Sequence, residues 1–508
     1  MRVRRWINLV SVIIIVIFLN LIAVRYYYKI DLTENKVYTV SEATKKILFR
    51  LRSPLNVKVI VSDDIPSPYN TSVRFFLDVL NEYKSVAADK VKIDIIQDAP
   101  QIIEKAANLY GIPPVQVNAI ESDSLQIKKI YMGAVLIYED KTETIPVIAN
   151  IRVPEYELTS LIKRMSSEKE KYVAIIDAGK SANPYSNMRT VFEALSKNYK
   201  VESVKIEKGK LIDKKYDVAI LVSPIEELKP EEVYPIEEFL FSGKSVILAV
   251  DKVDGAVQSG YAFKKETGLE KFFSKNGVNL TDNLVFDANA TLINVSRNAG
   301  GFIITTAVKY PFFPEVINFN RELMITKGLS AVNMIFPTEI KIDKKDHLIV
   351  TPIMFSSEKA GFEKEPYNVS LDRQYDLNDF KYSKIPLAFM LEGKFVSEFK
   401  KPLNEYKDNF RKEGEGKLIL IADGEMFKDD YIVSGDNLKF MQNLVDFLLS
   451  DPELLELRGK VVRFHPIKID NPANAVLLKY VILFAPPLFV IIIGFVIIRI
   501  FGKRRVRL

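Results

Sequence analysis

The sequence contains no cysteine among its 508 residues. This absence excludes disulfide bonds, thiolate metal sites and cysteine nucleophiles together. Histidine is almost absent as well: His347 and His465 are the two present, and neither belongs to an HExxH pattern or a recognisable Ser/His/Asp arrangement. We therefore predict that the protein is not an enzyme and that it has no catalytic residues, no cofactor and no metal site.

The interior of the chain also lacks a concentrated basic stretch. The formal net charge is +6, but eight basic residues at the two ends exceed that whole excess, so the remainder is slightly acidic. They are Arg2, Arg4 and Arg5 at the start and Arg499, Lys503, Arg504, Arg505 and Arg507 at the end. Because nucleic-acid binders gather positive charge on one surface, we predict no nucleic-acid partner.

A phosphate-binding loop is missing too, although "GKS" occurs at 179–181 and at 243–245. A P-loop needs a further glycine five residues before the glycine of this triplet, so that backbone amides can wrap a phosphate. Ala174 and Glu238 occupy those positions, which argues against nucleotide binding.

Long apolar runs are confined to the two ends of the chain. Residues 7–24 and 476–501 each approach the roughly 17–25 residues that cross a bilayer, and we expect two transmembrane helices there. A cleavable signal peptide is the alternative for the first run. The flanking basic tails, 1–6 and 502–508, place both termini in the cytoplasm. The protein is then expected in the plasma (inner) membrane, with a periplasmic or extracellular ectodomain.

The sequence between these runs alternates apolar strand-like segments with amphipathic helical ones. We predict a first α/β domain over 25–168 and a second over 169–465, with a polar, loop-rich stretch at 356–384. Alternation of this kind implies parallel strand pairing. The expected fold class is α/β: an N-terminal α/β unit and a doubly wound, largely parallel-sheet domain, flanked by the two transmembrane helices.

Three aspartates directly follow strand-like runs in the second domain: Asp177, Asp251 and Asp423. Ligands bind such folds at the carboxyl ends of parallel strands, so these residues are candidate ligand contacts. Turn and helix-cap roles are the alternative explanation.

The segment 29–48, "KIDLTENKVYTVSEATKKIL", begins the folded part of the chain. Thr39 followed three residues later by Glu42 has the spacing of a capping box. It predicts a helix that starts near residue 40 and continues through Leu48.

This segment resembles the start of the auxiliary membrane proteins of ABC transporters related to gliding-motility GldG. The resemblance rests on Asp31, Leu32, Thr33, Tyr38, Thr39, Ser41 and Thr44, which fall on that family's "DLT…YTLS…T" segment. Further similar stretches are "YGIPPVQV" (110–117), "LEKFFSKNGVNLTDNLVFD" (269–287), "IPLAFMLEGKFVS" (385–397), "IADGEMFKDD" (421–430) and "NLKFMQNLVDFLL" (437–449). None of them is a catalytic motif.

The resemblance implies a GldG-type, amidotransferase-like ectodomain and a non-catalytic subunit that works with separate ABC permease and ABC ATPase chains. The ectodomain would bind an envelope glycan, peptide or lipid, or an envelope partner, or shape the exit path. A membrane-anchored glycan- or peptide-binding scaffold without a transporter is the alternative. An unusual hydrolase is a third hypothesis, which predicts a cleft of clustered carboxylates with perturbed pKa values.

Overall fold

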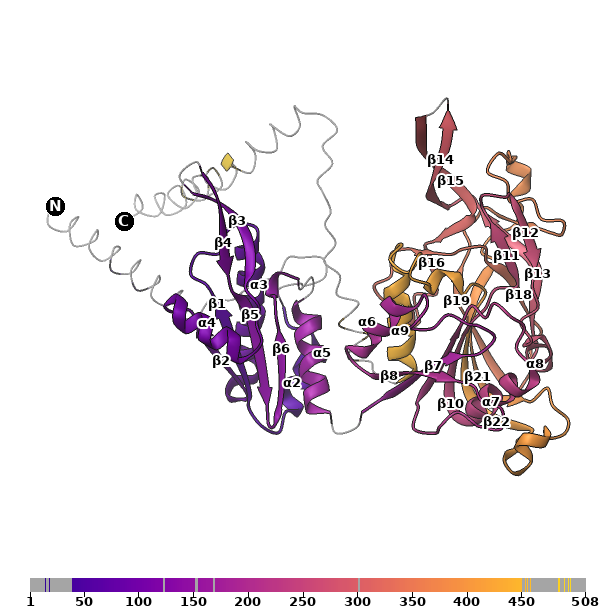
Figure 1. The fold of residues 1–508 in the computed structure, drawn as a ribbon, viewed down its shortest axis with the longest axis horizontal. Coiled ribbons are helices and arrows are strands. Elements are labelled where there is room, and N and C mark those ends of the chain that lie inside the picture. Colours follow the sequence, from indigo (N-terminus) through magenta and orange to yellow (C-terminus); the bar gives the residue numbers. More distant parts are fainter. Residues whose placement is uncertain are drawn as a thin grey trace, which may run out of the picture. The chain divides into compact units, whose positions relative to one another are not determined.

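A computed structural model gives the structure of this chain (Figure 1). The described residues are 39–121, 124–150, 154–167, 170–299 and 302–449, with the isolated positions 14, 18, 453, 455, 457, 483, 484, 488, 492 and 494. The chain forms two units, Met1–Val461 and Val462–Leu508. The fold described below belongs to the first unit.

The first folded region is built on a four-stranded sheet with the strand order β2-β1-β5-β6. β1 pairs in parallel with β2 and antiparallel with β5, and β5 forms a hairpin with β6. The bounds of these strands are β1 (Leu55–Val61), β2 (Val91–Ile96), β5 (Met132–Tyr138) and β6 (Lys141–Ile145). A separate hairpin joins β3 (Val115–Glu121) to β4 (Ser124–Ile130).

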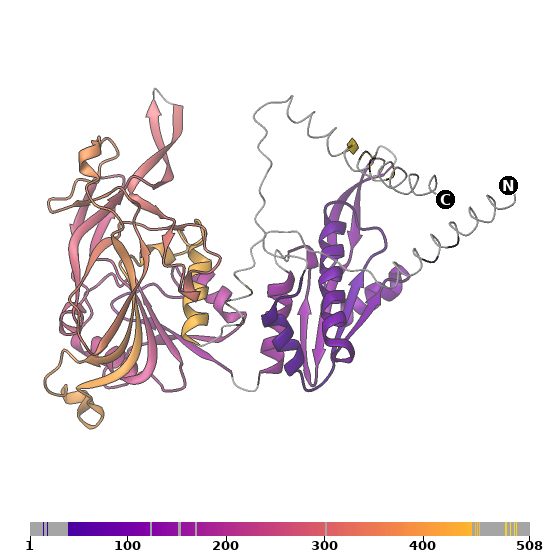
Figure 2. The same cartoon turned by 180° about the vertical axis from the view of Figure 1, so that it is seen from behind.

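Helices cover both faces of this sheet, and Figure 2 shows them from behind. Val57 and Val59 of β1 pack into a core with three helices, whereas Ile60 packs on the other face against a fourth. The division follows the alternation of side chains along a strand. The three helices are α2 (Glu42–Arg50), α3 (Tyr69–Ala87) and α5 (Pro154–Ser166), and the fourth is α4 (Pro100–Leu109).

The main sheet has eight strands in the order β16-β19-β21-β22-β10-β9-β7-β8. The five from β22 to β8 are parallel, and the other three are antiparallel. In chain order they are β7 (Tyr172–Asp177), β8 (Lys200–Lys205), β9 (Val218–Val222), β10 (Ser242–Ala249), β16 (Asn318–Phe319), β19 (Leu348–Phe355), β21 (Pro386–Val396) and β22 (Glu413–Ile421). "KLILIADGEMF" thus supplies a strand of the sheet that begins at 172, as the sequence suggested.

Both faces of the main sheet are buried, which explains why its parallel strands are continuously apolar. Ile247 of β10 packs on one face with α6 (Arg189–Ser196) and α9 (Asn437–Leu448). The next residue, Leu248, packs on the opposite face with α7 (Pro230–Phe241) and α8 (Glu270–Lys275). The helices therefore hold β10 and its neighbours in place from both sides.

Between β10 and β21 the chain adds several small antiparallel sheets around an aromatic core. Phe286, Tyr310, Phe312 and Phe336 are buried in this core, and the β14–β15 hairpin extends from it (Figure 1). The strands are β11 (Val253–Ala256), β12 (Tyr261–Lys264), β13 (Val278–Asp287), β14 (Ala290–Ala299), β15 (Phe302–Val316), β17 (Val332–Asn333), β18 (Thr338–Ile342) and β20 (Ala360–Glu363).

The predicted fold class is wrong in including two transmembrane helices. Within the residues that the structure describes, no helix is both long and apolar enough to cross a membrane. Even α3, the 19-residue helix, is amphipathic: it packs one face into the core and carries charged side chains on the other. The segments 7–24 and 476–501 lie outside the described residues, apart from isolated positions.

The described chain is a mixed α/β structure with many strands. The antiparallel strands of the main sheet and the small sheets beside it were not expected from the sequence. The division into domains at 168 and 169, the two tails and the boundaries of the expected helices are not tested by this architecture and stay predictions.

Candidate functional site at the carboxyl edge of the main sheet

Two of the three predicted aspartates lie at the same place on the main sheet. β10 and β22 are parallel neighbours, and Ala249 pairs with Ile421 at their last matched positions. Asp251 and Asp423 each follow two residues later, so both reach the carboxyl edge together. Asp177 ends β7, which β9 separates from β10. Ligand contact by any of the three stays a prediction.

Asp423 is fully buried and held by backbone amides. Its Oδ2 accepts a hydrogen bond from the N–H of Ile335 at 2.5 Å, and its Oδ1 accepts one from the N–H of Met426 at 3.2 Å. Burial and then the nearby charge of Asp251 raise the pKa of the Asp423 carboxyl well above its usual value, which outweighs these donors. Burial therefore disfavours the charged form of this carboxyl.

Asp251 is only 3% exposed, and its two carboxylate oxygens differ in their hydrogen bonds. Oδ1 accepts hydrogen bonds from the N–H of Gly424 at 2.6 Å and from the N–H of Glu425 at 3.3 Å. Oδ2 is buried and accepts no hydrogen bond, although Lys265 Nζ lies 3.8 Å away as a loose ion pair. A buried carboxylate oxygen without a donor is costly, so this atom has an unmet need for a hydrogen-bond donor.

The turns that follow β9 and β22 touch each other at this edge. A Cβ on Gly424 would lie 2.6 Å from both Ala249 O and Ser223 N, so the approach requires glycine. Ser223 has a φ of +46°, an uncommon conformation for a residue other than glycine. Its hydroxyl donates to Glu425 Oε1 at 2.8 Å. Strained backbone of this kind gathers at functional sites.

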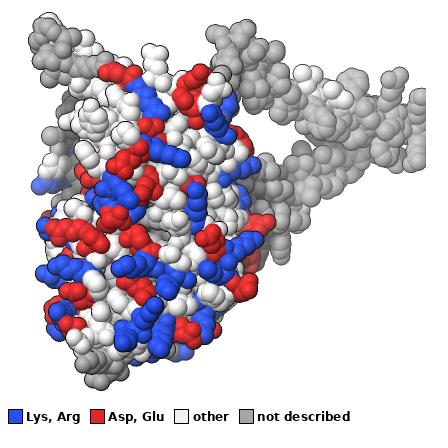
Figure 3. Space-filling model, turned by 90° about the vertical axis from the view of Figure 1, so that its right-hand side faces the viewer, with Lys and Arg blue, Asp and Glu red and all other residues white. Residues whose placement is uncertain are grey.

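A cavity of about 540 Å³ lies beside these residues, and we call it the edge cavity. Its charged lining has both signs: Asp251, Asp254, Lys265, Glu425 and Lys428. Its apolar and aromatic lining is formed by Ile225, Val253, Val257, Ile335, Phe336 and Tyr431. Glu425 is already paired with Lys428. The surface in Figure 3 likewise intersperses Lys and Arg with Asp and Glu rather than separating them.

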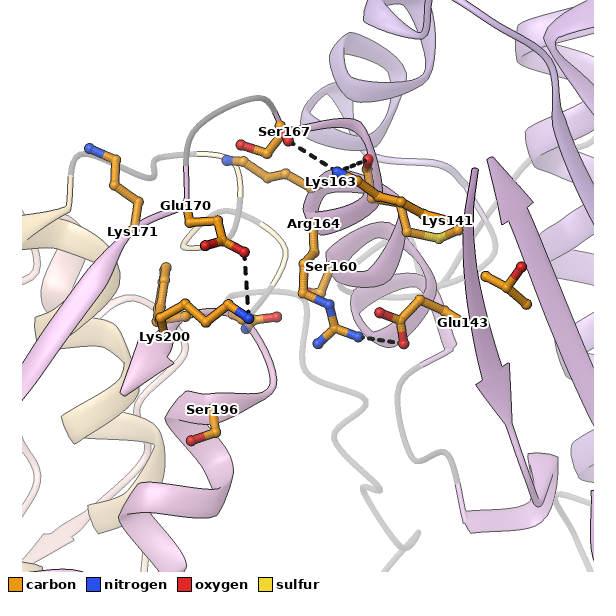
Figure 4. Close-up of a pocket in the computed structure, with 14 residues that line it drawn as sticks. Lys141, Glu143, Ser160, Lys163, Arg164, Ser167, Glu170, Lys171, Ser196 and Lys200 are labelled. Carbon is orange, nitrogen blue, oxygen red and sulfur yellow. Dashed lines mark hydrogen bonds and ion pairs between the residues drawn. The ribbon is translucent and has the colours of Figure 1, made fainter. Parts of the chain in front are cut away.

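A second cavity, of about 490 Å³, is lined by residues of α5, β6 and the end of α6 and is more basic (Figure 4). Its cations are largely engaged by the chain itself. Lys141 Nζ donates to Met165 O at 2.9 Å, and Arg164 donates to Lys197 O and pairs with Glu143 at 2.8 Å. These carbonyls belong to the ends of α5 and α6, where cations are stabilising. Helix capping therefore explains much of this basic lining.

The family-motif residues fall at the start of the described chain. Asp31, Leu32, Thr33 and Tyr38 lie outside the described residues, and Thr39 is the first residue after them. The predicted cap at Thr39 is wrong: α2 begins after Ser41, whose hydroxyl accepts a hydrogen bond from the N–H of Thr44 at 3.1 Å. Spacing alone could not decide between two neighbouring hydroxyl residues.

Ser41 and Thr44 also belong to a polar cluster between α2, α3 and α5. The buried Glu155 accepts hydrogen bonds from Ser41 N at 2.7 Å and from Thr44 Oγ1 at 2.8 Å. Tyr83 adds a hydrogen bond to Glu155 O at 3.0 Å. The described motif residues therefore join three helices, and a role in contacting a partner stays a prediction.

Sequence reasoning missed most of the charged lining of the edge cavity. Glu425 and Lys428 follow Asp423 closely in "DGEMFK", so a search around that aspartate could have found them. Lys265 could not have been found this way, because it follows β12 and reaches Asp251 through folding alone. Among the described residues, no group of three or more His, Cys, Asp or Glu side chains could hold a metal ion.

Comparison with known proteins gives two family matches. The model of a family described as "ABC-type uncharacterized transport system" matches residues 170–450, which is more than half of the chain and includes the whole main sheet. The model of a domain of unknown function matches residues 34–137.

A curated relative, an uncharacterized protein of Borreliella burgdorferi, is 23% identical over 456 residues, which cover 86% of this chain and 85% of the relative. Among solved structures, the mmIFT52 N-terminal domain is 13% identical with a TM-score of 0.34 and covers 55% of this chain and 98% of its own. A putative ThuA-like protein from Parabacteroides merdae is 11% identical with a TM-score of 0.28, covering 59% and 94%. Likenesses this weak support no argument about structure or function.

Proposed function

Because this chain belongs to the auxiliary family of ABC-type transport systems, we propose that it is a non-catalytic subunit of an ABC transporter whose main domain binds a ligand or an envelope partner. The family implies association with ABC transporter components. We infer that these components are a permease and an ATPase carried on separate chains. The narrower assignment to GldG-related proteins stays a prediction.

The single observation that carries this proposal is the extent of the family match. It covers residues 170–450, and it therefore contains the main sheet, the small sheets beside it and every residue that lines the edge cavity. The part of the chain that the family shares is thus the part that presents a cavity at the carboxyl edge, where open α/β sheets bind ligands.

The chemistry of this edge supports binding rather than catalysis. The two oxygens of Asp423 accept hydrogen bonds from backbone N–H groups. Ser223 is fully buried, and its hydroxyl donates a hydrogen bond to Glu425. A nucleophile needs access to substrate and an adjacent base, and Ser223 lacks that access. We accordingly assign no catalytic residue at this edge: Ser223 is inaccessible, and Asp423, whose pKa is raised, is fully buried and held by backbone N–H groups.

The location of the protein is part of the proposal. We place the described region on the extracytoplasmic side of the plasma membrane, where an auxiliary subunit would meet ligands or envelope partners. Protease digestion of host cells stripped of any outer membrane tests this placement: cleavage of the described region while the plasma membrane is intact is expected, and protection until that membrane is lysed would contradict it.

Affinity purification from the native host tests the transporter role. The full-length chain, tagged at its chromosomal locus, should recover an ABC permease and an ABC ATPase that are absent from an untagged strain. Asp251→Asn serves as a matched variant, because Asn keeps the acceptor for Gly424 and removes only the charge in the edge cavity. It should still recover both partners. Recovery of neither partner would favour the scaffold that acts without a transporter.

A further inference from the structure

We propose that the edge cavity binds a small zwitterionic ligand of the free α-amino acid class, with the ligand ammonium on Asp251 and its carboxylate on Lys265. The inference deepens the proposed function and rests on it only for the biological role of the ligand, as cargo or as signal. Binding itself is a property of the purified chain and can be tested without any partner.

Asp251 has one carboxylate oxygen without a hydrogen-bond donor. Asp251 lines the edge cavity; its Oδ2 is buried and accepts no hydrogen bond, while its Oδ1 already accepts hydrogen bonds from the N–H groups of Gly424 and Glu425. A full positive charge compensates a buried carboxylate better than a neutral donor does, because charge-assisted hydrogen bonds are about twice as strong. An ammonium group at this position would supply that donor.

A cation, the ammonium group of Lys265, lies beside the carboxylate of Asp251. Lys265 Nζ lies 3.8 Å from Asp251 Oδ2, too far for a hydrogen bond, and its side chain is mostly buried. The two atoms thus present an acceptor and a set of donors next to each other. An α-amino acid carries its ammonium and its carboxylate on the same carbon, so one ligand can contact Asp251 and Lys265 at once.

The lining of the edge cavity carries charges of both signs. Asp251, Asp254 and Glu425 face the cavity together with Lys265 and Lys428. A purely anionic ligand would meet the three carboxylates, and a purely cationic one would meet the two ammonium groups. A ligand with both charges avoids either repulsion. This lining also differs from a metal site, for which the described residues offer no sufficient ligand group.

The edge cavity has room for a ligand side chain beyond Asp251 and Lys265. The volume of about 540 Å³ falls in the usual range for small-molecule sites, roughly 300–1,000 Å³. Phe336 and Tyr431 line it, and Phe336 is held with a φ of +51°. The side chain of the amino acid would therefore lie against aromatic and aliphatic surface, which favours an apolar or aromatic side chain.

Equilibrium binding to the purified full-length chain tests the proposal. Calorimetry with L-leucine and L-phenylalanine is expected to show binding, and Asp251→Asn and Lys265→Met should each weaken it by about tenfold or more, the loss expected for one charge-assisted contact. Lys394→Met is the control, because Lys394 pairs with Glu413 near the opposite end of β22. It should bind as the wild type does.

Blocked ligands show which end contacts which residue. N-acetyl-leucine lacks the ammonium, so Asp251→Asn should not weaken its binding further; leucinamide lacks the carboxylate, so Lys265→Met should not weaken its binding further. Thermal melting of each variant confirms that it is folded, and Lys265→Met gives a second test if Asp251→Asn is not.

Absence of amino acid binding by the folded wild-type chain would overturn the proposal. It would also be overturned if both variants bound amino acids normally, or if glucose and galactose bound in their place with the same dependence on Asp251. Each of these results leaves the recovery of a permease and an ATPase unaffected, so failure of this inference is distinct from failure of the transporter role.

Discussion

The carboxyl group of Glu237 in the main domain is buried and accepts hydrogen bonds from two donors. Glu237, on α7, is 1% exposed; its Oε2 accepts from Ser397 Oγ at 2.5 Å and its Oε1 from Glu398 N at 3.0 Å. Burial raises its pKa to about 8, and these hydrogen bonds only partly oppose the rise. Glu237 is therefore largely protonated at neutral pH and couples the stability of the domain to pH.

Replacing Glu237 should flatten the pH dependence of stability. The folded chain holds a proton that the unfolded chain releases, so the free energy of unfolding should fall as pH rises from about 4.5 to about 8. Glu237→Gln keeps an acceptor and a donor for its partners but cannot titrate. Urea unfolding across this range should show a shallower decline for the variant than for the wild type. Parallel declines would contradict the assignment.

Replacing Gly424 tests whether the turn after β22 must lie close to the backbone of Ala249 and Ser223. Gly424→Ala should destabilise the chain by about 1–3 kcal/mol, because the new Cβ would meet the backbone of Ala249 and Ser223. Gly243→Ala is a useful comparison, since Gly243 has open space around its Cβ position and a φ of +80°, so only backbone strain is added there. Chemical denaturation measures both. An unchanged midpoint for Gly424→Ala would mean that the turns separate easily.

Individual helices and strands determine where the candidate site lies and where the first folded region begins. α2 starts at a specific cap, Ser41, and packs against α3 and α5 through the polar cluster around Glu155. In the main domain, β10 and β22 bring two distant aspartates to one edge. In both cases a short segment fixes the position of residues that are more than a hundred positions apart in the sequence.

Ser41→Ala should destabilise the first folded region by about 0.5–2 kcal/mol, the usual cost of losing a hydroxyl cap. The Ser41 hydroxyl accepts a hydrogen bond from the N–H of Thr44 at 3.1 Å, and the variant loses this acceptor. Ser85→Ala provides a comparison, because the Ser85 hydroxyl is exposed and donates only to Glu82 O within α3. Thermal melting should show a clear loss for the first variant and little for the second; equal effects would contradict the capping role.

The strands were predictable where local pattern determines them. Apolar runs such as 172–177 and 218–222 indicate buried strands by themselves, since both faces of the main sheet are covered. The small sheets beside it were not predictable in this way. β13 pairs with β18 at one edge and with β20 at the other, and these partners lie well apart in the sequence. Pairing of that kind depends on the whole fold.

The candidate site was predictable in part for the same reason. Asp251 and Asp423 could be placed at one edge because each follows a buried strand. Their adjacency depends on the order of strands in the sheet, and the contact with Lys265 depends on a hairpin that joins the site only in the folded chain. The class of ligand that fits this site could therefore be inferred only from the three-dimensional structure.

The described part of the chain contains two regions that have their own sheets and mostly their own cores. The cores on both faces of the first sheet are drawn from residues between Val40 and Met165, whereas the main sheet draws mainly on residues from Val173 onward. This separation predicts that a fragment spanning 39–167 folds alone. Cooperative thermal unfolding followed by circular dichroism would support the predicted boundary near 168, and a gradual, non-cooperative loss of signal would contradict it.

The transporter role is tested most directly by capture in the reverse direction. An ABC ATPase identified with this chain is tagged at its own locus, and the complex is quantified by mass spectrometry. Our account predicts that this chain is recovered with the ATPase and its permease in a fixed ratio that does not change between independent preparations. Recovery of the ATPase and permease as a complete complex without this chain would contradict the account.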